Sequence, residues 1–485
     1  MKQQSKLSNG WSITTIGDLI MHDGIFIDGD WIESKDQDPN GNIRLIQLAD
    51  IGDGYYRNKS NRFLTTERAH ELNCTFLKAG DLLIARMPDP LGRACIFPGD
   101  IKESVTAVDV CIVRTGSKGA NHSWLMYAIN SPQFRTMVER LQSGSTRKRI
   151  SRSNLAKITF SLPPLPEQER IVERIESLFT QLDAGVAGLK RVKKALKRYK
   201  ASVLKAACEG RLVAQDPSDE PAVELLMKLG QEPLERDDLP ELPEGWCWAF
   251  IGTVARKIQY GTSDKADNNS DGILVLRMGN LIDGQLDFKH LKFIQINSPG
   301  LSKLMLEPGD LLFNRTNSAE LVGKTAVYKE NHPKASFASY LIRVQMQPEI
   351  LPDYISYYIN SIYGRQYIMS VVSQQVGQAN VNGTKLSKMP VPLPPSMEQY
   401  RIVAEVERRF SVVQELEQTI DANLKRAARL RQAILKRAFE GKLVGQDESV
   451  ELLPPRKIST KEPVKKQDLE DPPEIESARQ LELFD

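Results

Sequence analysis

The hydrophobic pattern of the chain changes twice to steps of three and four residues, which predicts two long amphipathic helices. The apolar positions of the first helix are Ile171, Ile175, Leu178, Leu182, Val186, Leu189, Val192, Leu196, Tyr199 and Val203. Those of the second helix are Ile402, Val406, Phe410, Val413, Leu416, Ile420, Leu424, Ala427, Leu430 and Ile434. Prolines precede both stretches, and Gly210 and Gly441 follow them, as is usual at helix starts and C-terminal caps. This spacing is typical of a coiled coil, and one helix cannot bury its stripe alone. We therefore expect the two helices to pair as an antiparallel coiled coil.

The segments outside these helices predict mixed α/β structure. Turn signals followed by apolar runs, at Gly80–Arg86 and Gly309–Arg315, are typical of a turn that leads into a strand. Ser123–Leu141 and Tyr354–Val372 are each expected to form one helix shortly before a proline-rich junction. We therefore predict an α+β fold class, with two globular α/β domains separated by the two long helices.

The chain also repeats itself. Leu162–Asp216 and Leu393–Asp447 align without a gap, from LPPLPEQERIV against LPPSMEQYRIV to EGRLVAQD against EGKLVGQD. A weaker match extends upstream to the Gly-Trp pairs that begin at Gly10 and Gly245. Such a repeat identifies a tandem duplication and predicts internal pseudo-twofold symmetry. Because the helical segments match while the globular parts differ almost completely, we expect the helices to do one job twice and the globular parts to act on different targets.

These landmarks divide the chain into six expected parts. They are a first globular domain (1–161), a first helical segment (162–216), a linker (217–241), a second globular domain (242–392), a second helical segment (393–447) and a flexible tail (448–485).

Composition restricts the class of protein. The chain has 485 residues, 41% hydrophobic and 26% charged, with a formal net charge of +3, which is the profile of a soluble protein of several domains. Its apolar runs are shorter than a membrane span, and MKQQSKLSNG lacks the apolar core of a secretory signal. The five cysteines form no CxxC pair, so we expect reduced, mostly buried thiols in a cytoplasmic protein without a membrane partner.

No catalytic motif is complete. Gly323–Thr325 ends like a phosphate-binding loop, but Ser318 stands where that loop needs a glycine. Asp89, Asp100 and Lys102 have the residue types of a metal nuclease, in a pattern short enough to arise by chance in a long chain. The five histidines show no metal-ligand spacing. We therefore expect no catalytic residue, no metal site and no cofactor on this chain.

Polar loops at matching places of the two repeats are better candidates for a binding site. Ser143–Asn154 combines Arg and Lys with hydroxyl residues, which bind phosphates and, through Arg, guanine edges. Ser373–Lys385 is rich in Gln and Asn, whose amides pair with adenine, and Gln259–Gly272 and Asn314–Lys324 are similar polar loops. The alternative is that these segments are ordinary solvated loops, and their recurrence at matching places counts against it. The candidate DNA-binding residues are Arg86, Arg93, Ser145, Thr146, Arg147, Lys148, Arg149, Arg152, Tyr260, Thr262, Ser263, Lys265, Arg277, Asn280, Arg315, Asn317, Gln375, Gln378, Asn380, Asn382 and Lys385.

A lysine stripe on the first long helix has three interpretations. Its members are Lys190, Lys193, Lys194, Lys197 and Lys200. They can contact phosphates, contact a partner subunit, or form the solvated flank of the coiled coil.

The chain resembles the specificity subunits of type I restriction–modification systems from about Leu7 to Asp447. The resemblance is carried by the doubled LPP…EQ-x-RIV helix starts, the EG-[RK]-LV-x-QD helix ends, the Gly-Trp openings and the GDLL-type segments. It implies two target-recognition domains, each reading half of a split and asymmetric site in double-stranded DNA, held apart by spacer helices.

The resemblance also implies partners. Two methyltransferase subunits, which use S-adenosylmethionine, dock on this chain, and restriction/translocase subunits, which use ATP and Mg²⁺, join through them. On that reading this chain binds none of those cofactors.

Two other function classes stay open at this point. One is a self-contained DNA-modifying enzyme with an unrecognised active site, and the other is a coiled-coil scaffold without a DNA role. Replacing Arg147, Lys148 and Arg149 together by Ala is expected to weaken DNA binding and to flatten its salt dependence.

Overall fold

The computed structural model describes residues 10–20, 23–116, 120–296, 300–375 and 378–445. The chain divides into two compact units, one formed by Met1–Ser177 with Gln432–Asp485 and the other by Leu178–Arg431. We refer to these as unit 1 and unit 2. The expected tail at 448–485 lies outside the described residues.

Unit 1 is built on one four-stranded, one three-stranded and one two-stranded sheet, in the orders β2-β8-β5-β6, β4-β3-β7 and β1-β9. Its strands are β1 (Ser12–Thr15), β2 (Ile25–Asp28), β3 (Ile43–Ile46), β4 (Phe63–Leu64), β5 (Leu82–Ala85), β6 (Ala94–Ile96), β7 (Ser104–Thr106), β8 (Val110–Arg114) and β9 (Thr159–Leu162). Its shorter helices are α1 (Thr66–Glu71), α2 (His122–Ile129), α3 (Pro132–Leu141) and α4 (Arg152–Ala156).

Unit 2 repeats these three sheets, in the orders β11-β20-β16-β18, β15-β12-β19 and β10-β23, and adds the sheets β13-β14 and β17-β22-β21. Its strands are β10 (Cys247–Phe250), β11 (Ala255–Tyr260), β12 (Ile273–Leu276), β13 (Leu281–Ile282), β14 (Gln285–Leu286), β15 (Phe293–Ile294), β16 (Leu311–Asn314), β17 (Thr316–Asn317), β18 (Thr325–Val327), β19 (Ala335–Phe337), β20 (Leu341–Met346), β21 (Ser373–Gln375), β22 (Gln378–Asn380) and β23 (Pro390–Leu393). Its shorter helices are α6 (Ala222–Lys228), α7 (Ile251–Val254), α8 (Pro352–Asn360), α9 (Ile362–Val371) and α10 (Gly383–Ser387).

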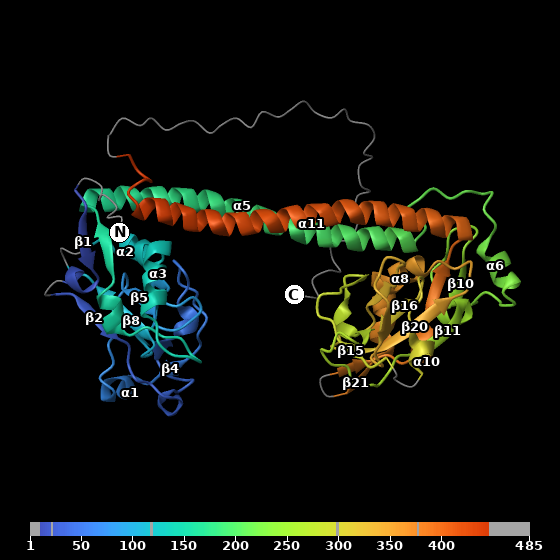
Figure 1. Cartoon of the computed structure of the whole chain (residues 1–485), viewed down its shortest axis with the longest axis horizontal. Helices are drawn as coiled ribbons and strands as arrows, with labels where there is room; N and C mark the ends of the chain where they lie inside the picture. The colour runs from blue at the N-terminus through green and yellow to red at the C-terminus, as the bar shows by residue number, and fades with distance from the viewer. Residues whose placement is uncertain (1–9, 21–22, 117–119, 297–299, 376–377, 446–485) are drawn as a thin grey trace. The chain divides into compact units, whose positions relative to one another are not determined.

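The duplication seen in the sequence is therefore a duplication of topology. In each unit one three-stranded sheet combines an antiparallel with a parallel strand pair: β3 runs parallel to β7 in unit 1, and β12 parallel to β19 in unit 2. Each unit also closes with an antiparallel pair between its first strand and the strand before its long helix. The predicted α+β class and the two globular α/β parts are confirmed (Figure 1).

The two predicted long helices are α5 (Leu165–Cys208) and α11 (Ser396–Phe439), each of 44 residues. Proline at 163–164 and 394–395 precedes each helix and fixes its start, because proline cannot donate to a preceding helical turn. At about 1.5 Å per residue each helix is about 66 Å long. Helix α5 begins in unit 1 and ends in unit 2, whereas α11 begins in unit 2 and ends in unit 1.

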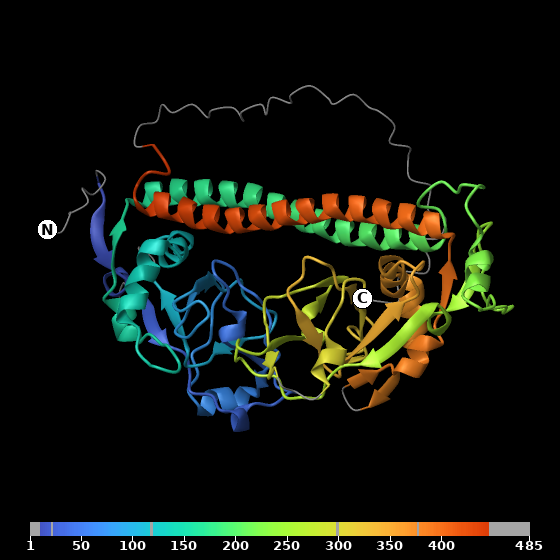
Figure 2. The same cartoon turned by 45° about the vertical axis from the view of Figure 1, so that its right-hand side comes forward.

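Within unit 2 the two helices pair in antiparallel orientation. Ion pairs join Lys193 to Asp421 at 2.6 Å and Lys200 to Glu417 at 2.9 Å, so that the partner's number falls as the number on α5 rises. Arg431 of α11 extends the series to Asp183. Figure 2 shows α5 and α11 side by side along this stretch. The predicted antiparallel coiled coil is confirmed there.

The apolar stripe of the paired helices is only partly covered. Val413 and Ile420 are buried, whereas Val192, Leu416 and Leu430, at predicted seam positions, are 45–49% exposed. The ends of the stripe are buried instead: Ile171 is buried in unit 1, and Ile402 is part of the core of unit 2. The pair of helices thus carries apolar surface that the described residues leave open.

The helices predicted over Ser123–Leu141 and Tyr354–Val372 are each two helices, which corrects that expectation. Ser131 caps α3 by accepting a hydrogen bond from the backbone N–H of Phe134, and Ser361 caps α9 in the same way. A serine cap starts a new helix because its hydroxyl satisfies a free N–H of the first turn. The apolar periodicity continues across the break, which hides it in the sequence.

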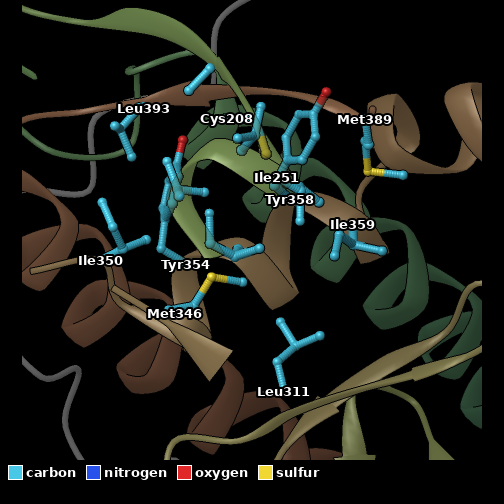
Figure 3. Close-up of a cluster of buried hydrophobic side chains, with 14 of the residues drawn as sticks. Cys208, Ile251, Leu311, Met346, Ile350, Tyr354, Tyr358, Ile359, Met389 and Leu393 are labelled. Carbon is cyan, nitrogen blue, oxygen red and sulfur yellow. The ribbon is translucent and has the colours of Figure 1, made fainter. Parts of the chain in front are cut away.

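Residues 217–241, expected to be a linker, include a packed helix. Leu225 and Leu226 of α6 are buried in the core of unit 2 with Trp246. Figure 3 shows other members of this core, among them Tyr354, Tyr358 and Cys208, which comes from the end of α5. The end of α5 is therefore part of the core of unit 2.

All five cysteines are free and buried, as expected. Burial raises the pKa of the Cys74, Cys95 and Cys208 thiols to about 12 and that of Cys247 to about 11. Among the described residues no helix combines the length and the apolar character that crossing a membrane requires.

Candidate functional site

The Glu-Gln pair of each LPP…EQ motif ties the long helix to its globular part. The Trp11 indole N–H donates to Glu167 at 3.0 Å in unit 1, and the Trp246 indole N–H donates to Glu398 at 2.9 Å in unit 2. The glutamine that follows each glutamate is buried and accepts a backbone N–H from the start of a neighbouring helix. These repeated residues are therefore structural, and they explain why Gly-Trp and EQ recur together in the sequence.

The aspartate of each Gly-Asp-Leu-Leu segment is also structural. Asp81 pairs with Arg114 at 2.5 Å, and Asp310 pairs with Arg343 at 3.1 Å, with both aspartates buried. A buried carboxylate needs such a partner because its hydration is lost. The residues that match between the two units thus hold the scaffold.

In unit 1 the most exposed polar segment is a tight loop between Ser143 and Arg149. The two residues exchange backbone hydrogen bonds of 2.8 Å in both directions. Gly144 has φ +92°, and a Cβ there would lie 2.2 Å from the carbonyl oxygen of Arg147, so only glycine fits this turn. The loop presents five exposed candidates: Ser145, Thr146, Arg147, Lys148 and Arg149. None of these five side chains has a hydrogen bond or ion pair to the described part of the chain, so they are free to contact a ligand.

Two further arginines lie next to this loop and share one carboxylate. Arg86 pairs with Asp28 at 2.9 Å, and the Arg152 guanidinium lies 3.5 Å from the same side chain. Arg86 also donates to the backbone carbonyls of Ile150 and Val108, which fixes the end of the loop. Asp28 was not among the predicted residues, because an isolated aspartate at the end of a strand gives no sequence signal.

Arg93 is buried, unlike the candidates of the loop Ser143–Arg149. It is 3% exposed, and its guanidinium donates to four backbone carbonyls, those of Leu48, Ile51, Met87 and Pro90. These bonds use four of the five N–H donors of the guanidinium, so in this conformation Arg93 organises loops rather than facing solvent.

In unit 2 the corresponding place is occupied by the sheet β17-β22-β21, which has no counterpart among the described strands of unit 1. This sheet brings together Asn317, Gln378 and Asn380 from segments far apart in the sequence. The Asn380 amide donates to the Thr316 hydroxyl at 2.7 Å, while Gln378 is exposed. Gln375 lies in β21, and its side chain is outside the described residues.

Tyr260 and Arg315 border this sheet. The Arg315 guanidinium lies 4.8 Å from the centre of the Tyr260 ring, and the Tyr260 hydroxyl accepts the Gly383 N–H at 2.7 Å. Arg315 occupies the strand position that Arg86 has in unit 1, but there the partner is Asp28 instead of an aromatic ring. Equivalent arginines of the two units therefore have different neighbours, a carboxylate in unit 1 and an aromatic ring in unit 2.

The remaining candidates of unit 2 are spread over the loops around this sheet. Thr262, Ser263 and Lys265 follow β11, and Ser263 and Lys265 are exposed. Asn382 caps α10, and Lys385 donates to Ser373 at 2.6 Å, which joins α10 to β21.

Arg277 and Asn280 lie apart from this group. Asn280 is 3% exposed, and its side chain accepts the Arg277 N–H and donates to the Asp287 carbonyl. It holds a turn, as Asp50 does in unit 1. The structure thus assigns Asn280 a local structural role. The sequence did not indicate this role, because a buried and an exposed asparagine look the same there.

The two surfaces differ in chemistry. That of unit 1 is a cationic loop, suited to phosphates and guanine edges, and that of unit 2 is an amide-rich sheet beside an aromatic ring, suited to adenine edges. Among the described residues no group of three or more His, Cys, Asp or Glu is placed to hold a metal ion.

Comparison with known proteins identifies the family. The model of the type I restriction modification DNA specificity domain matches residues 8–190 and again residues 243–426. The chain is 28% identical to the type I restriction enzyme EcoKI specificity subunit of Escherichia coli strain K12, over 69% of this chain and 68% of that protein. It is 27% identical to the StySPI specificity subunit of Salmonella potsdam, with the same coverage.

A solved structure shares the fold. It comes from work on complex assembly and conformational transition of the type I restriction–modification system, and it matches with a TM-score of 0.65 at 20% identity, over 90% of this chain and 99% of the other. The matched residues of the family model end where α5 and α11 pair, so each copy consists of a globular part and most of its helix. The chain belongs to the type I restriction modification DNA specificity family, and it is a DNA-sequence specificity subunit rather than an enzyme.

Proposed function

We propose that each unit reads one half of a split, asymmetric site in double-stranded DNA. The observation that carries this proposal is the contrast between the units: scaffold contacts such as Trp–Glu repeat, while the polar surfaces on that scaffold differ. Duplication of one scaffold supplies two readers, and divergence of their surfaces lets the two half-sites differ in sequence. The cationic loop Ser143–Arg149 serves one reader, and the sheet of Asn317, Gln378 and Asn380 serves the other.

Helices α5 and α11 act as spacer and docking surface in this proposal. A pair of rigid helices about 66 Å long sets the distance between half-sites. The exposed apolar side chains of Val192, Leu416 and Leu430 suit a partner that supplies further helices, because uncovered stripes of this kind favour protein contact. We assign this surface to two methyltransferase subunits.

The cofactors belong to the partners in this proposal. S-adenosylmethionine binds the methyltransferase subunits, and ATP and Mg²⁺ bind the restriction/translocase subunits that join through them. This chain contributes sequence selection only. We place the assembly in the cytoplasm, in keeping with five free cysteines.

Mapping of adenine methylation across the genome, in the source cell with and without this gene, tests the proposal. The expected result is the loss of one split motif on deletion, which also identifies both half-sites. The proposal is wrong if the methylome is unchanged and the purified chain, with a methyltransferase subunit, binds no duplex. Those two results would favour a coiled-coil scaffold without a DNA role.

A further inference from the structure

Unit 2 contains a groove that no part of the proposed function uses. It has a volume of about 1010 Å³ and lies between the paired helices and the globular part of the unit. One wall is the lysine stripe of α5, namely Lys190, Lys193, Lys194, Lys197 and Lys200. The opposite wall includes Lys324, Lys329 and Arg365 from the globular part. We refer to this as the lysine groove.

The groove has an excess of positive charge. Its lining holds these eight cationic residues against four carboxylates, which are Asp283, Asp353, Glu407 and Glu417. Lys193, Lys200 and Lys329 are neutralised by ion pairs. Lys190, Lys194, Lys197 and Lys324 have no carboxylate partner among the described residues. Four cations that face one groove without partners repel each other, and an anionic ligand would relieve that repulsion.

The three free lysines of α5 lie on one face of the helix. They are spaced four and three residues apart, which on an α-helix places them one above the other, over about 10 Å of its length. Lys190, Lys194 and Lys197 line the groove and are also exposed, so their side chains are accessible from solvent. Such a row fits an extended anion better than a single small one.

Unit 1 provides an internal comparison. At the same place in its fold it has a groove of about 510 Å³, with Asn130 and Arg135 standing where unit 2 has Asn360 and Arg365. Asn130 and Asn360 make the same paired bonds to the backbone of β6 and β18. The charged lining of the unit 1 groove is Asp53, Asp89, Glu139, Arg135 and Lys148. Among the described residues, the row of lysines therefore lines the groove of unit 2 and not that of unit 1.

This asymmetry decides between the three interpretations of the stripe. The role of solvated flank gives no reason for Lys324 of the globular part to line the same groove as the stripe. A row of lysines that served two identical partner subunits would recur in the groove of each unit, and the lining of the unit 1 groove has no such row. The interpretation that remains is a ligand that presents a row of negative charges to unit 2.

We propose that the lysine groove binds the phosphate backbone of duplex DNA without reading its sequence. The proposal rests on the DNA-binding function proposed above and adds a contact outside the base-reading surfaces. Lysine suits this task because its ammonium group is a point charge on a flexible stem, whereas base recognition favours the planar fork of arginine. Phosphate contacts of this kind add affinity that depends on salt and leaves the ratio between sequences unchanged.

The test uses the full chain with four substitutions, Lys190→Gln, Lys194→Gln, Lys197→Gln and Lys324→Gln. The matched control is Arg191→Gln, Arg198→Gln, Lys425→Gln and Arg426→Gln, which removes the same charge from exposed positions of α5 and α11 outside the groove. Binding of a cognate and of a scrambled duplex is measured by fluorescence anisotropy across a salt series. Circular dichroism and melting of both variants establish that they are folded.

The expected result is a salt slope lower by about 2 to 4 in the groove variant, because each lost phosphate contact removes about 0.9 from the slope of log K against log[salt]. The ratio of affinities for the two duplexes stays as in the unchanged chain, and the control keeps the original slope. A groove variant with the slope of the control overturns the proposal, as does a changed affinity ratio.

Two further outcomes separate this proposal from others. If the groove variant keeps its DNA affinity but no longer binds a co-expressed methyltransferase subunit, the groove is a protein-docking site and the proposal is wrong. If the unchanged chain binds neither duplex, alone or with that subunit, the proposed function itself fails.

Discussion

At the scale of single residues, the fold depends on a few buried charges that the duplication preserved. Arg343 and Asp310 are 4% and 3% exposed in their side chains and contact each other at 3.1 Å. Breaking a buried pair leaves one uncompensated charge, which costs about 3–5 kcal/mol. We expect Arg343→Met to lower the free energy of unfolding by that amount, measured by denaturant titration of the full chain.

The design includes two comparisons. Arg343→Met with Asp310→Asn should recover part of the loss, because the charge left behind is removed. Arg236→Met, in an exposed pair with Asp238, should cause no measurable change. Equal effects of Arg343→Met and Arg236→Met would contradict the structural role assigned to Arg343.

Glu398 gives a pH prediction. Burial raises its pKa above the ordinary 4.5, against the lowering effect of the bond from Trp246, and its buried Oε1 atom has no hydrogen-bond partner among the described residues. A raised pKa means that the folded chain binds more protons than the unfolded chain above pH 4.5, so this group's contribution to stability falls as pH rises from there.

We expect Glu398→Gln to keep the acceptor for Trp246 and to remove this decline, which gives a melting temperature equal or higher at pH 7. Melting curves from pH 4.5 to 8 check this, with Glu167→Gln as the matched variant at the same motif position in unit 1. A melting temperature at pH 7 well below that of the unchanged chain would show that the ionised carboxylate is needed.

The cysteines give a further residue-scale prediction. Their pKa values, raised by burial to about 11 or 12 for four of the five, leave almost no thiolate at pH 8. We expect iodoacetamide to label none of the five within the time that labels all five in denaturant, as measured by mass spectrometry. Rapid labelling of the folded chain would show that a region described as core opens readily.

At the scale of elements, α5 and α11 are held in register by charge as well as by apolar contact. Lys193 and Asp421 are each about half exposed, so their pair is worth only about 0.2–1 kcal/mol. Its position nevertheless specifies which residues face each other. We expect Lys193→Glu to lower the melting temperature slightly, because it sets two carboxylates against each other.

Adding Asp421→Lys to Lys193→Glu restores the opposite charges and should restore the melting temperature. The single variant Asp421→Lys is the control, since it also sets like charges together. A double variant no more stable than either single one would contradict the antiparallel register, and calorimetry of the full chain measures all four proteins.

At the scale of the whole molecule, the duplication predicts that recognition is modular. Replacing Arg147, Lys148 and Arg149 by Ala should relax sequence preference at one half-site and flatten the salt dependence of binding. Replacing Asn317, Gln378 and Asn380 by Ala should relax the other half-site and leave the salt slope unchanged, because amides carry no charge. At the intact half-site a wrong base pair should still cost about 1–3 kcal/mol.

Competition binding with duplexes scrambled in either half-site measures this. Each variant serves as the control for the other. Relaxation of both half-sites by one variant would mean that the units do not read independently, and an unchanged salt slope in the first variant would remove the cationic loop from the interface.

The sequence alone determined the duplication and the two long helices of this protein. Matching helical segments, the Gly-Trp openings and the doubled EQ motif identify the duplication, because a repeated scaffold needs the same contacts twice. Apolar steps of three and four located α5 and α11 and indicated that they pair. These signals are local or periodic, so they can be recognised in the sequence without the structure. The polar loop Ser143–Arg149 is recognised in the same way.

The tertiary structure decided what the candidate residues do. Arg93 and Asn280 look like ligand-binding residues by type, but the fold buries them and uses their polar atoms for backbone contacts. Asn317 joins Gln378 and Asn380 only through the pairing of β17 with β22, and Lys324 faces the lysine stripe only across the groove of unit 2. Burial and contact between distant segments depend on three-dimensional packing, and a sequence carries no local signal for either.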